Sequence, residues 1–187
     1  MSKKAKLNLS CKDKLSSSAK PKIKSNIILI GFMGCGKSSV ARALAKKLER
    51  ICLDTDALIE QSQNRKIKKI FSAQGEAAFR KMEKELLKRL KASVQNAVIA
   101  TGGGFGVQKG LKKLGLVVYL KMEFDEILSR LSGDKKQLKS RPLLKDLNAA
   151  KALFNARAGL YEKRANLIIE VKNKSVKEIA KEIRSKI

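Results

Sequence analysis

The sequence contains no histidine, and this absence excludes several kinds of active site. A Ser-His-Asp triad, a histidine-ligated zinc ion and a histidine general base are all ruled out. Tryptophan is absent too, and with two tyrosines and six phenylalanines the hydrophobic core must be mainly aliphatic. No apolar run approaches the roughly 18 residues of a membrane span, and the N-terminus has no hydrophobic segment typical of a secretory signal. We therefore expect a soluble protein without a membrane partner.

Paired cysteines are also missing. Cys11, Cys35 and Cys52 form no C-x-x-C motif, and their odd number argues against a disulfide framework. Cys35 lies in a glycine-rich loop where any small side chain suffices, which disfavours a catalytic thiol. Unpaired cysteines are typical of the reducing cytoplasm, so we predict a cytoplasmic protein.

Acidic residues are scarce relative to basic ones. The chain has 43 lysines and arginines against 17 aspartates and glutamates, a formal charge of +26. Such an excess attracts anions, including ATP, and also binds nucleic acid without specificity. Because no aromatic-rich stacking platform accompanies the charge, we predict no specific nucleic-acid partner. Residues 1–25 are predicted to be a basic, disordered tail, with a transit peptide as the alternative, and residues 26–187 to form one domain.

The stretch 31–38 reads GFMGCGKS and fits the phosphate-binding P-loop pattern G-x-x-x-x-G-K-[ST]. An apolar, β-branched strand (Asn26–Ile30) precedes it, and an amphipathic helix follows. In this context backbone N–H groups and a helix N-terminus can bind the phosphates of ATP, whereas a chance glycine-rich turn is the alternative. The predicted nucleotide-binding residues are Gly34, Cys35, Gly36, Lys37, Ser38 and Ser39.

Apolar patterns downstream predict strands and helices in alternation. This alternation favours a three-layer α/β/α domain around a parallel sheet. A polar, lysine-rich stretch over residues 132–146 lacks hydrophobic periodicity and is typical of a mobile lid. The further strands are expected at 51–56, 97–100, 116–120 and 167–171, and helices at 67–71, 75–91 and 147–163, near 57 and 124, and after an S-x-x-E capping box at 175–178.

Two acidic residues and three glycines are expected at strand ends. Asp54 and Asp56 lie two apart on the expected strand 51–56, so both side chains should point the same way. Residues 102–104 are all glycine and follow the expected strand 97–100, so backbone can approach a ligand closely there. In a parallel sheet, ligands bind beyond the carboxyl ends of the strands. We predict that one aspartate serves Mg²⁺ and the other an acceptor hydroxyl, with a turn that caps the next helix as the alternative.

Two arginines fall on apolar helix faces and therefore need an anion. Arg80 adjoins Phe79 and has Glu83 three residues later, so it is satisfied either within the protein or by a ligand. Arg157 has no carboxylate at i±3 or i±4, which favours ligand binding.

The ordered set of motifs resembles the shikimate kinase family over residues 26–187. This resemblance implies a P-loop kinase fold with a five-stranded parallel sheet in order 2-3-1-4-5 and a mobile lid. It also implies ATP-dependent phosphorylation of the shikimate 3-hydroxyl. The matching motifs are GFMGCGKS (31–38), LDTD (53–56), FR followed by Glu83, GGG (102–104), RPLL (141–144) and NARAGLY (155–161).

The resemblance also implies a role for individual residues. At the nucleotide, Lys37 and the lid residue Arg141 would contact the transferring phosphate, Ser38 and Asp54 would hold Mg²⁺, and Arg130 would flank the adenine. At the acceptor, Asp56 would be the base, Arg80 and Arg157 would bind the shikimate carboxylate, Gly102, Gly103 and Gly104 would line the ring, and Glu83 would orient Arg80.

Two other functions remain open from the sequence. A gluconate kinase would use the same architecture with another sugar acid, and a basic nucleic-acid-dependent NTPase would use the same P-loop. An acceptor panel separates the first, and stimulation by RNA or DNA separates the second. We expect a monomer.

Overall fold

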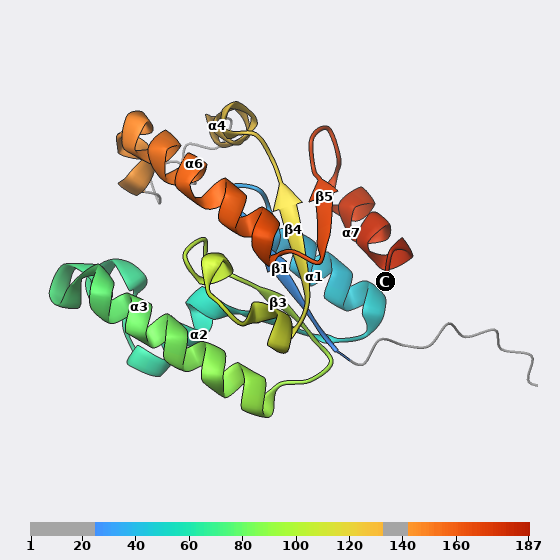
Figure 1. The fold of residues 1–187 in the computed structure, drawn as a ribbon, viewed down its shortest axis with the longest axis horizontal. Coiled ribbons are helices and arrows are strands. Elements are labelled where there is room, and N and C mark those ends of the chain that lie inside the picture. The colour runs from blue at the N-terminus through green and yellow to red at the C-terminus, as the bar shows by residue number, and fades with distance from the viewer. Residues whose placement is uncertain (1–24, 133–141) are drawn as a thin grey trace, which may run out of the picture.

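The computed structural model describes residues 25–132 and 142–187, and it contains one parallel sheet. The sheet has five strands in the order β2-β3-β1-β4-β5 (Figure 1). This confirms the expected sheet and its order. The predicted tail, except Ser25, and the middle of the predicted lid lie outside the described residues. The strands are β1 (Asn26–Ile30), β2 (Ile51–Asp54), β3 (Ala97–Ala100), β4 (Gly115–Lys121) and β5 (Leu167–Glu170).

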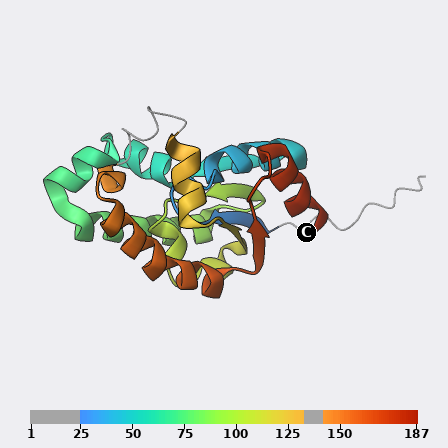
Figure 2. The ribbon, with the colours of Figure 1, turned by 90° about the horizontal axis from the view of Figure 1, so that it is seen from above.

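Helices cover both faces of the sheet, as Figure 2 shows. Helix α1 packs against β1, β2 and β3 and against α7, whereas α6 packs on the other face against β4. None of the helices in the described part of the chain is long and apolar enough to cross a membrane. The helices are α1 (Lys37–Leu48), α2 (Thr55–Gln63), α3 (Ile67–Ser93), α4 (Phe124–Ser132), α6 (Leu147–Arg164) and α7 (Val176–Ser185), with short 3-10 helices η1 (Phe105–Val107), η2 (Leu111–Lys113) and η3 (Pro142–Lys145).

Strand β1 is the centre of the sheet and is buried along its whole length. A strand covered on both faces reads as a continuous apolar run, and β1 does so after its first residue. That residue, Asn26, donates from Nδ2 to the carbonyls of Val94 (2.7 Å) and Leu114 (2.9 Å). Its Oδ1 accepts from the N–H of Ala97 at 3.0 Å. One satisfied amide side chain therefore fixes where β1 begins beside its neighbours.

Strand β2 ends two residues earlier than the sequence predicts. Asp54 is its last residue, and Oδ1 of Asp54 accepts hydrogen bonds from the N–H groups of Asp56 (3.0 Å) and Ala57 (3.4 Å). This side chain caps α2, so Asp56 lies in the first helical turn and not on an extended strand. The expectation that the two carboxylates share one strand face is wrong, because capping by Asp54 turns the chain into a helix.

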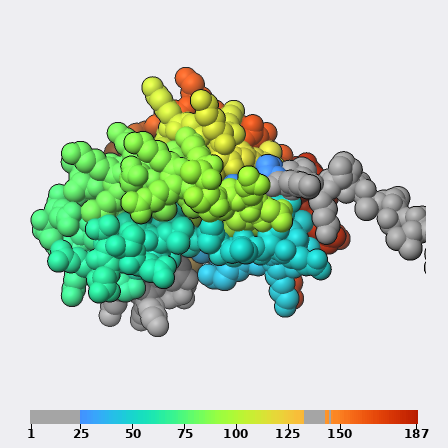
Figure 3. Space-filling view, turned by 90° about the horizontal axis from the view of Figure 1, so that it is seen from below, coloured from blue at the N-terminus to red at the C-terminus, as the bar shows by residue number. Residues whose placement is uncertain are grey.

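Helix α3 joins the two helices expected at 67–71 and 75–91. Gly75 has φ 77° and ψ 174°, so the axis changes direction there. Only the part after Gly75 carries Arg80 and Glu83. Together α2 and α3 cover one end of the molecule, shown in teal and green in Figure 3.

Both ends of the predicted lid are helical. Ser132 is the last residue of α4, residues 142–145 form η3, and Asp146 caps α6 by accepting from the N–H of Ala149 at 2.9 Å. Leu144 is buried and anchors this end of the segment in the core. The capping box before α7 is present as predicted: Glu178 Oε2 accepts from the N–H of Ser175 at 2.7 Å, and Ser175 Oγ accepts from that of Glu178.

Candidate active site

The P-loop joins β1 to α1 at the carboxyl end of the central strand. Gly36 has φ 93° in the left-handed region and directly precedes the helix, so the glycine lets the loop turn its N–H groups inward. Lys37 is 8% exposed, and its Nζ donates to the carbonyls of Gly31 (2.8 Å) and Phe32 (2.7 Å). Nζ also donates to Sγ of the buried Cys35, at 3.8 Å. The ammonium is thus held by the loop itself, and a bound phosphate must replace at least one of these contacts.

Ser38, in the first turn of α1, lies beside Asp54 at the end of β2. The Ser38 hydroxyl donates to Asp54 Oδ2 at 2.8 Å, while Oδ1 of the same carboxylate caps α2. The pair offers two hard oxygen atoms beside the P-loop. Within the described residues no cluster of three or more acidic, histidine or cysteine side chains could hold a metal.

Asp56 lies against Gly102 because of the strand register. Asp54 pairs with Ala100 in the sheet. Asp56 comes two residues after Asp54, and Gly102 comes two residues after Ala100, so the two lie side by side beyond the strand ends. The contact is so close that a Cβ on Gly102 would overlap the Asp56 carboxylate. The pKa of Asp56 is raised to about 6, chiefly by burial and then by the nearby charge of Asp54, while the positive charge of Lys37 opposes the shift. The site therefore holds a carboxyl group that changes its charge near neutral pH.

The three glycines form a ledge (Gly102, Gly103 and Gly104) after β3. None of them has a positive φ, so the missing Cβ, not backbone freedom, distinguishes them. A Cβ on Gly103 would lie 3.3 Å from the Arg157 guanidinium, and one on Gly104 would overlap that of Arg80. With Asp56 on Gly102, each glycine is covered by a different ionisable side chain. The structure thus brings the three predicted acceptor-binding side chains together over consecutive residues.

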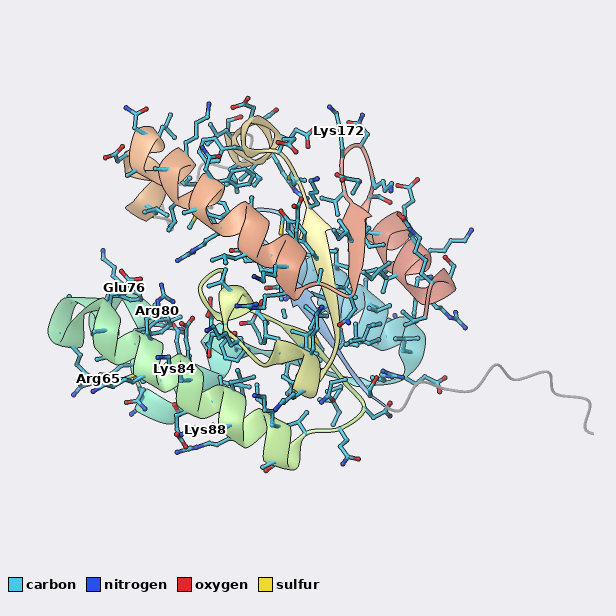
Figure 4. The ribbon with its side chains drawn as sticks, viewed as in Figure 1. Arg65, Glu76, Arg80, Lys84, Lys88 and Lys172 are labelled. Atoms are coloured by element: carbon cyan, nitrogen blue, oxygen red, sulfur yellow. The ribbon has the colours of Figure 1, made fainter. Side chains whose placement is uncertain are left out.

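Arg80 is held by two carboxylates of its own helix, Glu76 and Glu83. Figure 4 labels Arg80 and Glu76 on α3. Its NH1 donates to Glu83 at 2.6 Å, and its NH2 donates to Glu76 at 2.6 Å. Glu83 is 2% exposed and Glu76 63%, so the first pair is internal and the second faces solvent. Burial alone would lower the pKa of Arg80, but the hydrogen bonds to Glu83 and Glu76 outweigh it and raise that pKa. Glu76 was missed in the sequence, although its i,i+4 spacing to Arg80 was the available signal.

Arg157 finds a charge partner on another helix. Burial raises the pKa of Glu83, and the positive charges of Arg80 and Arg157 oppose that shift. The buried Glu83 thus interacts electrostatically with both arginines, one on α3 and one on α6. Spacing within α6 gave no sign of it, because the carboxylate comes from an element far away in the sequence.

Arg130 lies at the nucleotide end of the site. It is exposed, and its guanidinium covers the P-loop glycine Gly36, 3.3 Å from where a Cβ would be. Ser39 lies in the first turn of α1 and Gly34 in the loop before it. Arg141, expected to reach the transferring phosphate, lies outside the described residues.

A parallel sheet in this order, with a phosphate-binding loop after its central strand, is the architecture of P-loop kinases. The partly buried carboxyl group of Asp56 and the two arginines suit an acceptor that carries a hydroxyl and a negative charge. Fold and site together therefore define a kinase for a small anionic acceptor.

Comparison with known proteins identifies the family. The family model of shikimate kinase matches residues 33–187. A shikimate kinase of Helicobacter hepaticus is 43% identical over 158 residues, 84% of this chain and 93% of that protein. The structure of shikimate kinase from Acinetobacter baumannii in complex with shikimate has a TM-score of 0.79 and 36% identity, covering 88% of this chain and 93% of that chain. The shikimate kinase from Aquifex aeolicus has a TM-score of 0.73 and 37% identity, covering 86% and 94%. The chain belongs to the shikimate kinase family, and this confirms the resemblance noted in its motifs.

Proposed function

We propose that this protein transfers the γ-phosphoryl group of ATP to the 3-hydroxyl of shikimate, giving shikimate 3-phosphate and ADP on the route to aromatic amino acids. One observation carries the proposal. Asp56, Arg157 and Arg80 cover three consecutive glycines at the edge of the sheet where the P-loop lies. A base and two guanidinium groups on one short ledge match an acceptor with both a hydroxyl and a carboxylate.

At the nucleotide end, the N–H groups of residues 34–39 bind the phosphates and Lys37 neutralises the β- and γ-phosphates. The excess positive charge of the chain draws ATP toward this loop. Arg130 flanks the adenine, which is consistent with its guanidinium lying over Gly36. Arg141 reaches the transferring phosphate from the lid and excludes water.

Ser38 and Asp54 are the proposed Mg²⁺ site. The Ser38 hydroxyl and Oδ2 of Asp54 already lie 2.8 Å apart, and Oδ1 stays engaged in the cap of α2. Asp54 therefore presents one fixed oxygen to the metal, either directly or through a water molecule. When bound, Mg²⁺ neutralises developing charge on the phosphate oxygens.

At the acceptor end, Asp56 takes the proton of the hydroxyl. Because its pKa is about 6, it is mostly ionised at pH 7 and above and can accept that proton. Arg157 and Arg80 bind the carboxylate of the acceptor, and Glu83 orients both guanidinium groups. Residues 102–104 line the ring with backbone, and their missing side chains leave the space that Asp56, Arg157 and Arg80 occupy.

We further propose that the protein acts as a monomer in the cytoplasm. Every residue of the proposed site belongs to a single chain. Among the described residues Cys35 and Cys52 are free, which is typical of a reducing compartment.

The test is a coupled assay of ADP release with full-length protein, MgATP and a panel of acceptors including shikimate and gluconate. We expect turnover with shikimate only, and ¹H–³¹P NMR should place the phosphate on the 3-oxygen. Arg157→Ala should abolish most activity at low shikimate concentration, whereas the matched control Arg89→Ala, an exposed arginine of α3, should not. Turnover of gluconate in place of shikimate, or activity that depends on added RNA or DNA, would overturn the proposal.

A further inference from the structure

Two buried hydroxyl groups that the proposed mechanism does not use hold the glycine ledge in place. Thr55 Oγ1 accepts a hydrogen bond from the N–H of Gly102 at 3.0 Å. Tyr161 Oη donates to the carbonyl of Gly103 at 2.8 Å. Both Thr55 and Tyr161 are 0% exposed, so water cannot readily replace either partner.

Each hydroxyl belongs to an element that also carries an acceptor-binding side chain. Thr55 is in the first turn of α2 and directly precedes Asp56. Tyr161 is on α6, four residues after Arg157, so the two side chains lie on the same helix face. Both the Arg157 guanidinium and the Tyr161 hydroxyl lie within 3.5 Å of where a Gly103 Cβ would be. The ledge is therefore connected on one side to the proposed base and on the other to a proposed carboxylate ligand.

The ledge needs such connections because it has no side chains of its own. Three glycines in succession lose more conformational freedom on folding than any other residues would. The N–H of Gly106 donates to the carbonyl of Gly102 at 3.1 Å, and that of Val107 to Gly104 at 3.4 Å. These turns give the ledge its local shape, but they do not connect it to α2 or α6.

We propose that Thr55 and Tyr161 are positioning residues that set the distance of the ledge from Asp56 and from Arg157. This inference rests on the proposed function, because it assumes that the acceptor lies on the ledge. Thr55 acts on the base and therefore on turnover. Tyr161 acts on the carboxylate ligand and therefore on the affinity for the acceptor.

Thr55 is tested by comparing Thr55→Val with Thr55→Ser. Valine keeps the shape but leaves the N–H of Gly102 without a partner, and serine keeps the hydroxyl. We expect kcat to fall about 10²-fold in Thr55→Val, as for a misplaced reacting group, with little change in the KM of ATP. Thr55→Ser should restore most of the turnover. Equal losses in the two variants would show that the hydroxyl is not what matters.

Tyr161 is tested by comparing Tyr161→Phe with Tyr119→Phe. The two rings pack against each other with centroids 5.3 Å apart, and both are buried. Within the described residues, no hydrogen bond joins Tyr119 to residues 102–104. Tyr119→Phe therefore removes a buried hydroxyl without removing a contact to the ledge. We expect Tyr161→Phe to raise the KM of shikimate about tenfold, the effect of one lost hydrogen bond, with kcat nearly unchanged. A similar effect from Tyr119→Phe would point to core packing instead.

Amide hydrogen exchange tests the hydrogen bonds of Thr55 and Tyr161 to the ledge independently of activity. It is measured on full-length protein without substrates, in peptides covering residues 101–107. Exchange should accelerate about tenfold in Thr55→Val and in Tyr161→Phe, but not in Tyr119→Phe. Unchanged exchange in both test variants would overturn the inference. If Thr55→Val does not fold, Tyr161→Phe, which removes a single oxygen, decides. Failure of the unmodified protein to phosphorylate shikimate would overturn the proposed function. The exchange comparison would still test whether Thr55 and Tyr161 hold the ledge.

Discussion

The partly buried carboxylate of Asp56 should make the protein less stable at neutral pH than the same chain with asparagine in that position. Its pKa is raised from an ordinary 3.8 to about 6, chiefly by burial and then by the charge of Asp54. A rise of this size corresponds to about 3 kcal/mol of destabilisation once the group is ionised, at about 1.4 kcal/mol per pKa unit. The uncharged Asp56→Asn side chain has the same shape and avoids this cost.

The sign of the pH dependence follows from proton binding. At about pH 3, below both pKa values, the carboxyl group is mostly protonated in both states, so it contributes almost no difference. Between pH 4 and 6 the folded chain keeps a proton that the unfolded chain releases, so the free energy of unfolding falls as the pH rises. Above pH 6 the penalty is complete. The stability advantage of Asp56→Asn should therefore be only about 0.5 kcal/mol at pH 4 and reach about 3 kcal/mol at pH 7.

Urea unfolding of both proteins without nucleotide, at a series of pH values from 4 to 8, measures this difference. For a chain of this length the advantage corresponds to about 6–12 °C in Tm. Asp125→Asn is the control, since it removes an equally negative but exposed side chain at the start of α4 and should not stabilise. The same Asp56→Asn protein should lose about 10²–10⁴-fold in kcat while still binding ATP. An asparagine variant that is no more stable than the parent at pH 7 would refute the burial of the charge, and retained turnover would refute its role as base.

Three further results are expected. Arg157→Lys should raise the KM of shikimate about 10- to 100-fold, because lysine lacks the planar guanidinium fork that binds a carboxylate. The KM of ATP should stay unchanged in the same steady-state assays, and equal weakening for both substrates would contradict the role of Arg157. Glu83→Gln should raise the KM of shikimate by more than about tenfold, whereas Glu76→Gln should change it by less than about fivefold, because the first ion pair is buried and the second exposed; the reverse order would contradict the assignment. Ser38→Ala should raise the Mg²⁺ concentration for half-maximal activity about tenfold, and an unchanged Mg²⁺ titration would remove the hydroxyl from the metal site.

Local sequence predicted the strand, the loop and the helix around residues 31–38 because these parts are contiguous. The strand, the loop and the helix around residues 31–38 are consecutive, so their pattern specifies their geometry. Arg80 and Glu83 are likewise one turn apart, and their ion pair follows from helical spacing alone. The same spacing would have found Glu76.

Prediction failed where two local signals competed. Residues 51–56 have the apolar and β-branched character of a strand, but Asp54 is also a strong helix N-cap. The cap prevailed, and Asp56 moved from a strand to a helical turn. The carboxylate still reaches the ledge, because β2 pairs with β3 in a register that brings Asp56 beside Gly102.

By itself, the sequence determined the class of fold, the P-loop pattern at residues 31–38 and which charged residues we propose for the acceptor. These depend on patterns spanning a few residues, and such patterns act locally. Only the tertiary structure decided which of those residues meet. The contact of Thr55 with Gly102 joins positions 47 residues apart, and that of Tyr161 with Gly103 joins positions 58 apart. Contacts over such separations depend on strand register and on how helices pack across the sheet. Those two geometries are set by burial of the whole core and not by any short segment.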